Sequence, residues 1–134
     1  MASKLVGALP KVLGVVGAGQ MGSGIAQLAA MNGFRVLLQD ANSDALGRGM
    51  EGVSKSLSRF VKKGALTEEK AKDCVGLITP VRELAPFEEA DFVVEAVSES
   101  EDLKRSIFGA LDEVTRPEAI LASNTSSISI TRIA

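Results

Sequence analysis

The stretch that decides the fold of this chain is LGVVGAGQMGSGIA, residues 13–26. Four glycines fall within eight positions there, at Gly17, Gly19, Gly22 and Gly24. The apolar run before them is typical of a short buried strand, and the apolar spacing after them is typical of a helix. A glycine-rich turn between a strand and a helix is the local context in which a GxGxxG pattern acquires a functional meaning.

Each glycine has a steric reason in such a turn. Gly17 permits the tight turn, Gly19 lets the backbone approach a pyrophosphate, and Gly22 lets the helix pack closely on the strand. We expect Gly24 to extend that close packing. The helix begins with unpaired N–H groups and a partial positive charge, so a diphosphate binds there without a lysine. The candidates for this role are Gly17, Gly19 and Gly22 with the intervening Gln20 and Met21.

Apolar runs alternate with helical patterns along the whole chain, which predicts an α/β fold with a doubly wound, mostly parallel sheet. The sequence ends where another strand and helix would be expected. We therefore expect an N-terminal arm over residues 1–10 and a dinucleotide-binding domain over 11–134 that is incomplete at its C-terminal end. Strands are predicted at 12–16, 34–39, 77–81, 91–97 and 119–122. Helices are predicted at 22–31, from Asn42 or Ser43 to Gly64, from Thr67 onward, and along the stripe Leu103, Ile107, Leu111 and Val114.

Asp40 ends the second predicted strand, 21 residues beyond Gly19. A carboxylate there is placed to bind the ribose hydroxyls of an adenine dinucleotide. It also repels the 2′-phosphate of NADP, and the following Ala41, Asn42 and Ser43 include no arginine to receive that group. The pattern therefore favours NAD, against the simpler alternative of a glycine turn followed by a surface or cap aspartate.

Composition narrows the remaining function classes. The 134 residues carry a net charge of -2, from 15 basic and 17 acidic residues without a basic stripe, so nucleic-acid binding is disfavoured. No apolar run reaches the roughly 18 residues of a membrane span, and the N-terminal apolar run is too short for a secretory signal. A single cysteine, Cys74, fits a reducing compartment and favours a cytoplasmic protein, with an organelle matrix as the alternative. The chain has no histidine and no tyrosine, two common proton-transfer residues.

Two polar segments follow the later predicted strands, where ligands of open α/β sheets bind. The first, SESEDLK, contains Glu99 and Lys104, which can hydrogen-bond a sugar or form a plain ion pair at a solvated helix end. The second, SNTSS at 123–127, offers five consecutive hydrogen-bonding side chains, and an ordinary helix cap is an equally good reading of it. From spacing alone both alternatives stay open.

Taken in order, GAGQMGSGIA, Asp40, VVEAVSE and ASNTSSISIT resemble the NAD-binding domain of the 3-hydroxyacyl-CoA dehydrogenases, and especially of 3-hydroxybutyryl-CoA dehydrogenases. The resemblance runs from about Lys11 to Ala134. It places Ala96, Glu99 and Lys104 near the nicotinamide end of the cofactor and Asn124 beside the nicotinamide ribose. It makes Ser126 the active-site serine that hydrogen-bonds the substrate 3-oxygen. It also implies that Ser56 and Lys63 contact the CoA moiety, although an exposed helix face explains those two residues equally well.

The resemblance further implies a reversible hydride transfer between NAD and the 3-carbon of a 3-hydroxyacyl-CoA. In that family a histidine, oriented by a glutamate, acts as acid and base, and it lies on a strand downstream of SNTSSISIT. A C-terminal helical domain completes the substrate cleft and forms a homodimer. Because this chain stops before both, we expect it to bind NAD without catalysing the reaction. The alternatives are a stand-alone nucleotide sensor and a related L-gulonate or β-hydroxyacid dehydrogenase.

Overall fold

The computed structural model describes residues 12–96, 101–117 and 119–123. The strands are β1 (Val12–Val16), β2 (Arg35–Gln39), β3 (Ile78–Val81), β4 (Phe92–Glu95) and β5 (Ile120–Ser123). The helices are α2 (Gln20–Met31), α3 (Ser43–Lys62), α4 (Glu68–Leu77) and α5 (Glu101–Val114), with a short 3-10 helix η1 (Ala85–Glu89). The strands form one sheet in the order β3-β2-β1-β4-β5, and each neighbouring pair is parallel, which confirms the predicted α/β fold.

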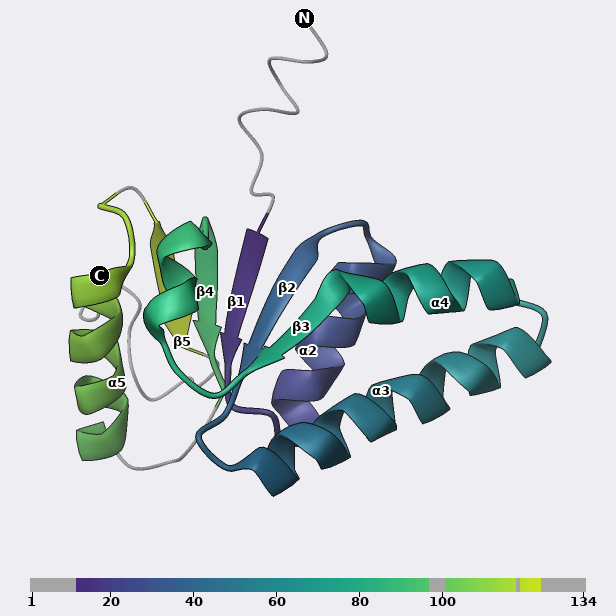
Figure 1. Ribbon diagram of the computed structural model, residues 1–134, viewed down its shortest axis with the longest axis horizontal. Helices are drawn as coiled ribbons and strands as arrows, with labels where there is room; N and C mark the ends of the chain where they lie inside the picture. The colour runs from purple at the N-terminus through teal and green to yellow at the C-terminus, as the bar shows by residue number, and fades with distance from the viewer. Residues whose placement is uncertain (1–11, 97–100, 118, 124–134) are drawn as a thin grey trace, which may run out of the picture.

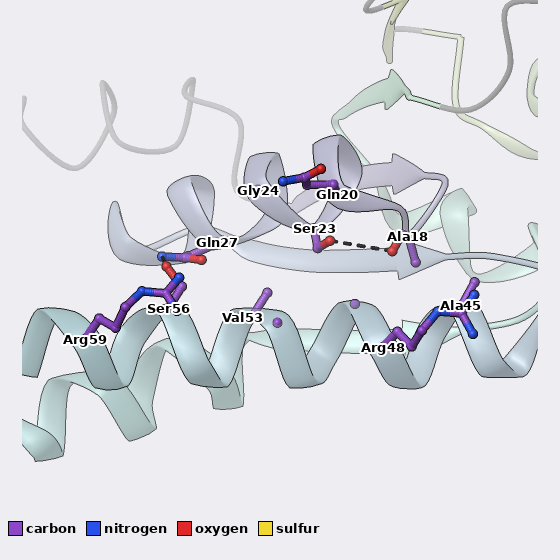
Figure 2. Close-up of a pocket in the computed structure, with 12 residues that line it drawn as sticks. Ala18, Gln20, Ser23, Gly24, Gln27, Ala45, Arg48, Val53, Ser56 and Arg59 are labelled. Carbon is purple, nitrogen blue, oxygen red and sulfur yellow. Dashed lines mark hydrogen bonds between the residues drawn. The ribbon is translucent and has the colours of Figure 1, made fainter.

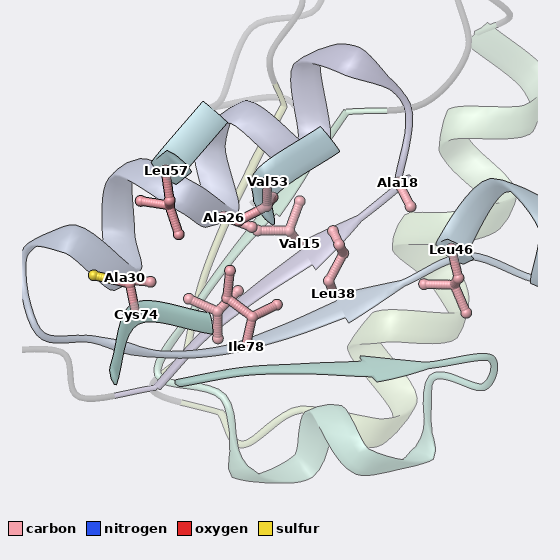
Figure 3. Packing of buried hydrophobic residues seen from close by; sticks show 11 residues of the cluster. Val15, Ala18, Ala26, Ala30, Leu38, Leu46, Val53, Leu57, Cys74 and Ile78 are labelled. Carbon is pink, nitrogen blue, oxygen red and sulfur yellow. The ribbon is translucent and has the colours of Figure 1, made fainter. Parts of the chain in front are cut away.

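Helices cover both faces of this sheet, as a parallel sheet requires (Figure 1). Successive side chains of a strand point to opposite faces, so neighbouring residues of β1 belong to different cores. Val15 packs in the core beneath α2, α3 and α4, together with Leu38 and Leu57 (Figure 3). Val16 packs in the core on the other face, with Phe87 of η1 and Leu111 of α5.

Two helix starts differ in how they are capped. The Asn42 side chain accepts hydrogen bonds from the N–H groups of Asp44 and Ala45, at 2.8 and 3.1 Å, so Asn42 is the cap of α3 and Ser43 is its first residue. Helix α2 begins at Gln20, two residues earlier than predicted, with Gly19 as a cap that offers no side chain. The glycine loop is therefore shorter than the sequence pattern indicated.

The edge of the sheet confirms one prediction and adds an element. Strand β3 forms as predicted and, within the described residues, pairs with β2 alone. An edge position is where Pro80 is tolerated. The sequence pattern did not predict η1, which carries the fully buried Phe87 against the sheet. A Cβ at Gly14 would lie 2.8 Å from the Phe87 ring, so glycine at that position of β1 makes room for the aromatic side chain.

No helix in the described part of the chain combines the length and the apolar character needed to cross a membrane.

Candidate functional site

The carboxyl ends of the five strands meet at one edge of the sheet. Their last residues are register partners across the sheet, namely Val81, Gln39, Val16, Glu95 and Ser123 in sheet order. The glycine loop leaves β1 at this edge, between β2 on one side and β4 on the other. Ligands of doubly wound sheets bind at this kind of switch point, where the chain turns to opposite sides of its first strand.

The glycine loop has the geometry that the sequence predicted at two of its positions. Gly17 has a φ of 103°, which side-chain-bearing residues rarely adopt, and its N–H donates to the Gln39 carbonyl at 2.6 Å. A Cβ at Gly22 would lie 1.7 Å from the Gly17 carbonyl oxygen, so only glycine lets the first turn of α2 pass this close to the loop. The close approach required of Gly22 is confirmed, with the loop itself as the nearest neighbour.

The two other glycines face open space. A Cβ at Gly19 would meet nothing within 4 Å, which leaves room for a ligand above the loop. The same is true of Gly24, so the expected close packing at that position is wrong. Gly24 is exposed and lines a surface groove.

Asp40 lies directly beside the glycine loop. One carboxylate oxygen, Oδ2, accepts a hydrogen bond from the Ala18 N–H at 3.0 Å, and the other, Oδ1, accepts from the Asn42 N–H at 2.9 Å. The main chain of Asp40 is held from the neighbouring strand, because its N–H donates to the Val81 carbonyl at 3.1 Å. The half-buried carboxylate thus joins the loop after β1 to the turn after β2.

The turn after β2 has an arginine neighbour that the linear sequence did not reveal. Arg82 follows β3 and donates from Nε and Nη2 to the Ala41 carbonyl, at 3.4 and 3.3 Å. Its side chain is exposed. A guanidinium therefore lies beside the turn after Asp40 although no arginine follows Asp40 directly in the sequence. It belongs to Arg82, which reaches the turn from the end of β3.

A groove of about 430 Å³ runs between α2 and α3, starting at the glycine loop (Figure 2). Ser56 lies at the far end, where its hydroxyl accepts a hydrogen bond from Gln27 Nε2 at 2.9 Å. Arg59 stands one turn further along α3 and lines the same end. The groove therefore offers polar and cationic side chains at a distance from the loop. Its lining residues are Ala18, Gln20, Ser23, Gly24, Gln27, Ala45, Arg48, Gly49, Gly52, Val53, Ser56 and Arg59.

The two residues proposed to contact CoA differ in their surroundings. Ser56 is half-buried and hydrogen-bonded within the groove, so it is more than a solvated helix residue. Lys63 is the C-terminal cap of α3 and is exposed, seven residues beyond Ser56 and hence on the same side of the helix.

The remaining predicted site residues are placed only in part. Ala96 follows β4, and its N–H donates to the Val16 carbonyl at 2.8 Å, which puts it beside the start of the glycine loop. Lys104 belongs to the first turns of α5. Glu99, Asn124 and Ser126 lie outside the described residues.

Sequence reasoning missed several residues of this region, above all Gln27, Arg59, Arg82 and Gly49. A Cβ at Gly49 would lie 2.7 Å from the Ala18 carbonyl oxygen, so this glycine lets α3 pack against the loop. A glycine inside a helical pattern is a signal for such an approach. However, α3 also contains Gly47 and Gly52, whose added Cβ atoms would meet nothing within 4 Å, and the sequence does not distinguish the three.

The parallel sheet, the glycine turn at its switch point and the adjacent carboxylate define a Rossmann-type dinucleotide-binding domain. Residues 12–134 match the family described as 3-hydroxyacyl-CoA dehydrogenase, NAD binding domain. The chain belongs to this family, and NAD is the cofactor of its domain.

Individual relatives agree with this assignment. The chain is 46% identical over 127 residues to 3-hydroxybutyryl-CoA dehydrogenase of Bradyrhizobium diazoefficiens, covering 95% of this chain and 43% of that protein. It is 45% identical over 124 residues to a probable 3-hydroxybutyryl-CoA dehydrogenase of Bacillus subtilis, with 92% and 43% coverage. The crystal structure of (S)-3-hydroxybutyryl-CoA dehydrogenase from Ralstonia eutropha superimposes with a TM-score of 0.89 at 38% identity, covering 93% of this chain and 44% of that one. This chain thus spans less than half the length of these relatives.

Proposed function

We propose that this chain provides the NAD site of a dehydrogenase that acts on 3-hydroxybutyryl-CoA. The observation that carries the proposal is the Asp40 carboxylate, which is held against the Ala18 N–H at the glycine turn. An adenosine ribose bound to this carboxylate would leave the diphosphate over Gly19, where no side chain intrudes. The first turn of α2 would supply N–H donors to the diphosphate, through residues 20–22.

NAD, when bound, takes a hydride from the substrate 3-carbon or returns it in the reverse reaction. In the proposal, Ala96, Glu99, Lys104 and Asn124 line the nicotinamide end, and Ser126 donates a hydrogen bond to the substrate 3-oxygen. The position of Ala96 beside β1 supports the first of these roles. The other residues come from the family resemblance.

Proton transfer sets a limit on what this chain does by itself. It contains no histidine and no tyrosine, so neither of these groups is available here to accept the substrate hydroxyl proton. We propose that residues 11–134 bind the cofactor, and that the acid and base, the helical domain and the homodimer interface belong to a longer protein. Mixed with NAD and 3-hydroxybutyryl-CoA, this chain should give no NADH absorbance.

Calorimetric titration tests the cofactor assignment. We expect NADH to bind this chain and NADPH to bind more weakly, because the 2′-phosphate would approach the Asp40 carboxylate. The fluorescence of the reduced nicotinamide provides an independent reading. An absence of NADH binding, or tighter binding of NADPH, would contradict the assignment.

We further propose that the CoA end of the substrate lies at the far end of the α2–α3 groove, near Ser56 and Lys63. Arg59 supports this, since it lines the same end and a guanidinium matches phosphate oxygens in pairs. In this arrangement the groove directs the acyl group toward the glycine loop, where the cofactor binds.

Free CoA is the probe for this second assignment. Replacing Ser56 with alanine should weaken CoA binding about fivefold, the effect of losing one ordinary hydrogen bond. Ser58→Ala is the matched control, because Ser58 lies on the same helix but lines the separate groove between α3 and α4. Equal CoA affinity in the two variants would exclude Ser56 from the site.

A further inference from the structure

Arg82 has an exposed side chain that hydrogen-bonds the Ala41 carbonyl, in the turn that follows Asp40. The main chain of Arg82 is fixed, because its carbonyl accepts a hydrogen bond from the buried Gln39 side chain at 2.9 Å. The guanidinium contacts the Ala41 carbonyl through two long bonds of 3.3 and 3.4 Å. The backbone of Arg82 is thus held in place, while its guanidinium makes only long hydrogen bonds to the protein in the described structure.

This position matters for the choice between the two dinucleotides. Asp40 and Ala41 are consecutive, and the Asp40 carboxylate folds back over this turn to accept the Asn42 N–H. A phosphate on the 2′-oxygen of a ribose bound by Asp40 would project into the same surroundings. The phosphate would meet repulsion from Asp40 and attraction from a guanidinium that can exchange the Ala41 carbonyl for phosphate oxygens.

We propose that Arg82 is a second determinant of dinucleotide choice, which attracts a 2′-phosphate and so offsets part of the discrimination imposed by Asp40. The proposal rests on the cofactor site assigned above and adds to it a residue from a different strand. It implies that this chain rejects NADPH less strongly than Asp40 alone would dictate. It also implies that Asp40 is the main barrier to a change of cofactor.

The contribution of Arg82 is modest in size because its side chain is exposed. Exposed ion pairs contribute up to about 1 kcal/mol, which corresponds to roughly a fivefold change in affinity. Salt should weaken the effect, since the charges interact through solvent. Measurements at low ionic strength therefore give the largest signal.

The experiment compares Arg82→Ala with the unmodified chain in competition titrations with NADH and NADPH. We expect NADPH to bind about fivefold more weakly to the variant while NADH binding stays within twofold. The same comparison in an Asp40→Ala background measures the effect of Arg82 on NADPH without the repulsion from Asp40. There, too, loss of Arg82 should weaken NADPH more than NADH.

Two further variants separate this role from a structural one. Arg35→Ala removes an exposed arginine at the opposite end of β2 and should leave the NADH to NADPH ratio unchanged. Arg82→Lys keeps the charge and should recover part of the NADPH affinity. If Arg82→Ala weakens both dinucleotides equally, or changes neither, in both backgrounds, the proposal is wrong. Failure of the unmodified chain to bind NADH would instead refute the proposed function, and this inference with it.

Discussion

The Asp40 carboxylate accepts one main-chain N–H on each oxygen, from Ala18 and from Asn42. Each carboxylate oxygen has a second lone pair, so both oxygens still have capacity to accept ribose hydroxyls. The residue therefore has two roles in the proposed site, because it binds the sugar and orients the loop that faces the diphosphate. Loss of the Asp40 side chain should therefore weaken the binding of both the adenosine ribose and the diphosphate.

Replacement of Asp40 by alanine should weaken NADH binding by roughly 1 to 3 kcal/mol, the cost of leaving hydrogen-bonding groups without their partner. Asp44→Ala is a suitable control, because Asp44 is an exposed carboxylate in the first turn of α3. The two affinities are compared by calorimetry at the same salt concentration. Equal NADH affinity in the Asp40 variant and the control would remove Asp40 from the cofactor site.

The glycines show how far residue-level reasoning reaches. The pattern around residues 17–24 correctly predicted that Gly17 and Gly22 need to be glycine, since a turn and a close approach follow from the motif. It assigned a packing role to Gly24, but that position faces the groove. One-dimensional spacing does not show which side of a helix a neighbouring element covers.

Among the elements, α3 contributes more to the site than its amphipathic pattern suggested. Its N-terminal cap, Asn42, lies in the turn after β2, and the Asn42 N–H donates to the Asp40 carboxylate. Its interior touches the loop at Gly49, where an added Cβ would lie 2.7 Å from the Ala18 carbonyl oxygen and 3.3 Å from the Ala18 Cβ. The loop is thus held between Asp40 on its N–H side and α3 on its carbonyl side.

Gly49→Ala should therefore displace Ala18 and lower both stability and NADH affinity. Overpacking of this kind costs about 1 to 3 kcal/mol of unfolding free energy. Gly47→Ala is the matched control on the same helix, where a Cβ meets open space, and it should stabilise the chain by up to about 1 kcal/mol through helix propensity. Urea denaturation and NADH titration give the two readings. A Gly49 variant as stable and as tight-binding as the Gly47 variant would show that α3 does not position the loop.

The elements differed in how well the sequence predicted them. Strand β1 has an apolar run that ends in a glycine turn, and helix α3 has a long apolar stripe that begins at a capping residue. Both elements form where expected. The short helix η1 has no such pattern, because five residues are too few to show a period. Its place depends on Phe87 filling the space beside Gly14, which is a contact between distant parts of the chain.

At the scale of the whole molecule, the aligned carboxyl ends of the strands bring three separate segments together. The last residues of β1, β2 and β4 are register partners in the sheet. The residues that follow them, Gly17, Asp40 and Ala96, therefore lie close together. The two cores fix this alignment, because Val15 and Val16 anchor β1 to helices on opposite faces. A slip of one residue would exchange the two faces, so burial on both sides sets the register.

The sequence alone determined the α/β class, the glycine turn, the carboxylate at the end of the second strand and the family resemblance, because each depends on local spacing and backbone sterics. Only the tertiary structure decided that Arg82 lies beside Ala41, that Gly49 rather than Gly47 meets the loop, and that Gln27 bonds Ser56. Gln27 and Ser56 are 29 positions apart in the sequence, and Ala41 and Arg82 are 41 apart. The contact at Gly49 depends on which side of α3 faces the loop. Such pairings follow from strand register and helix packing, which no local pattern encodes.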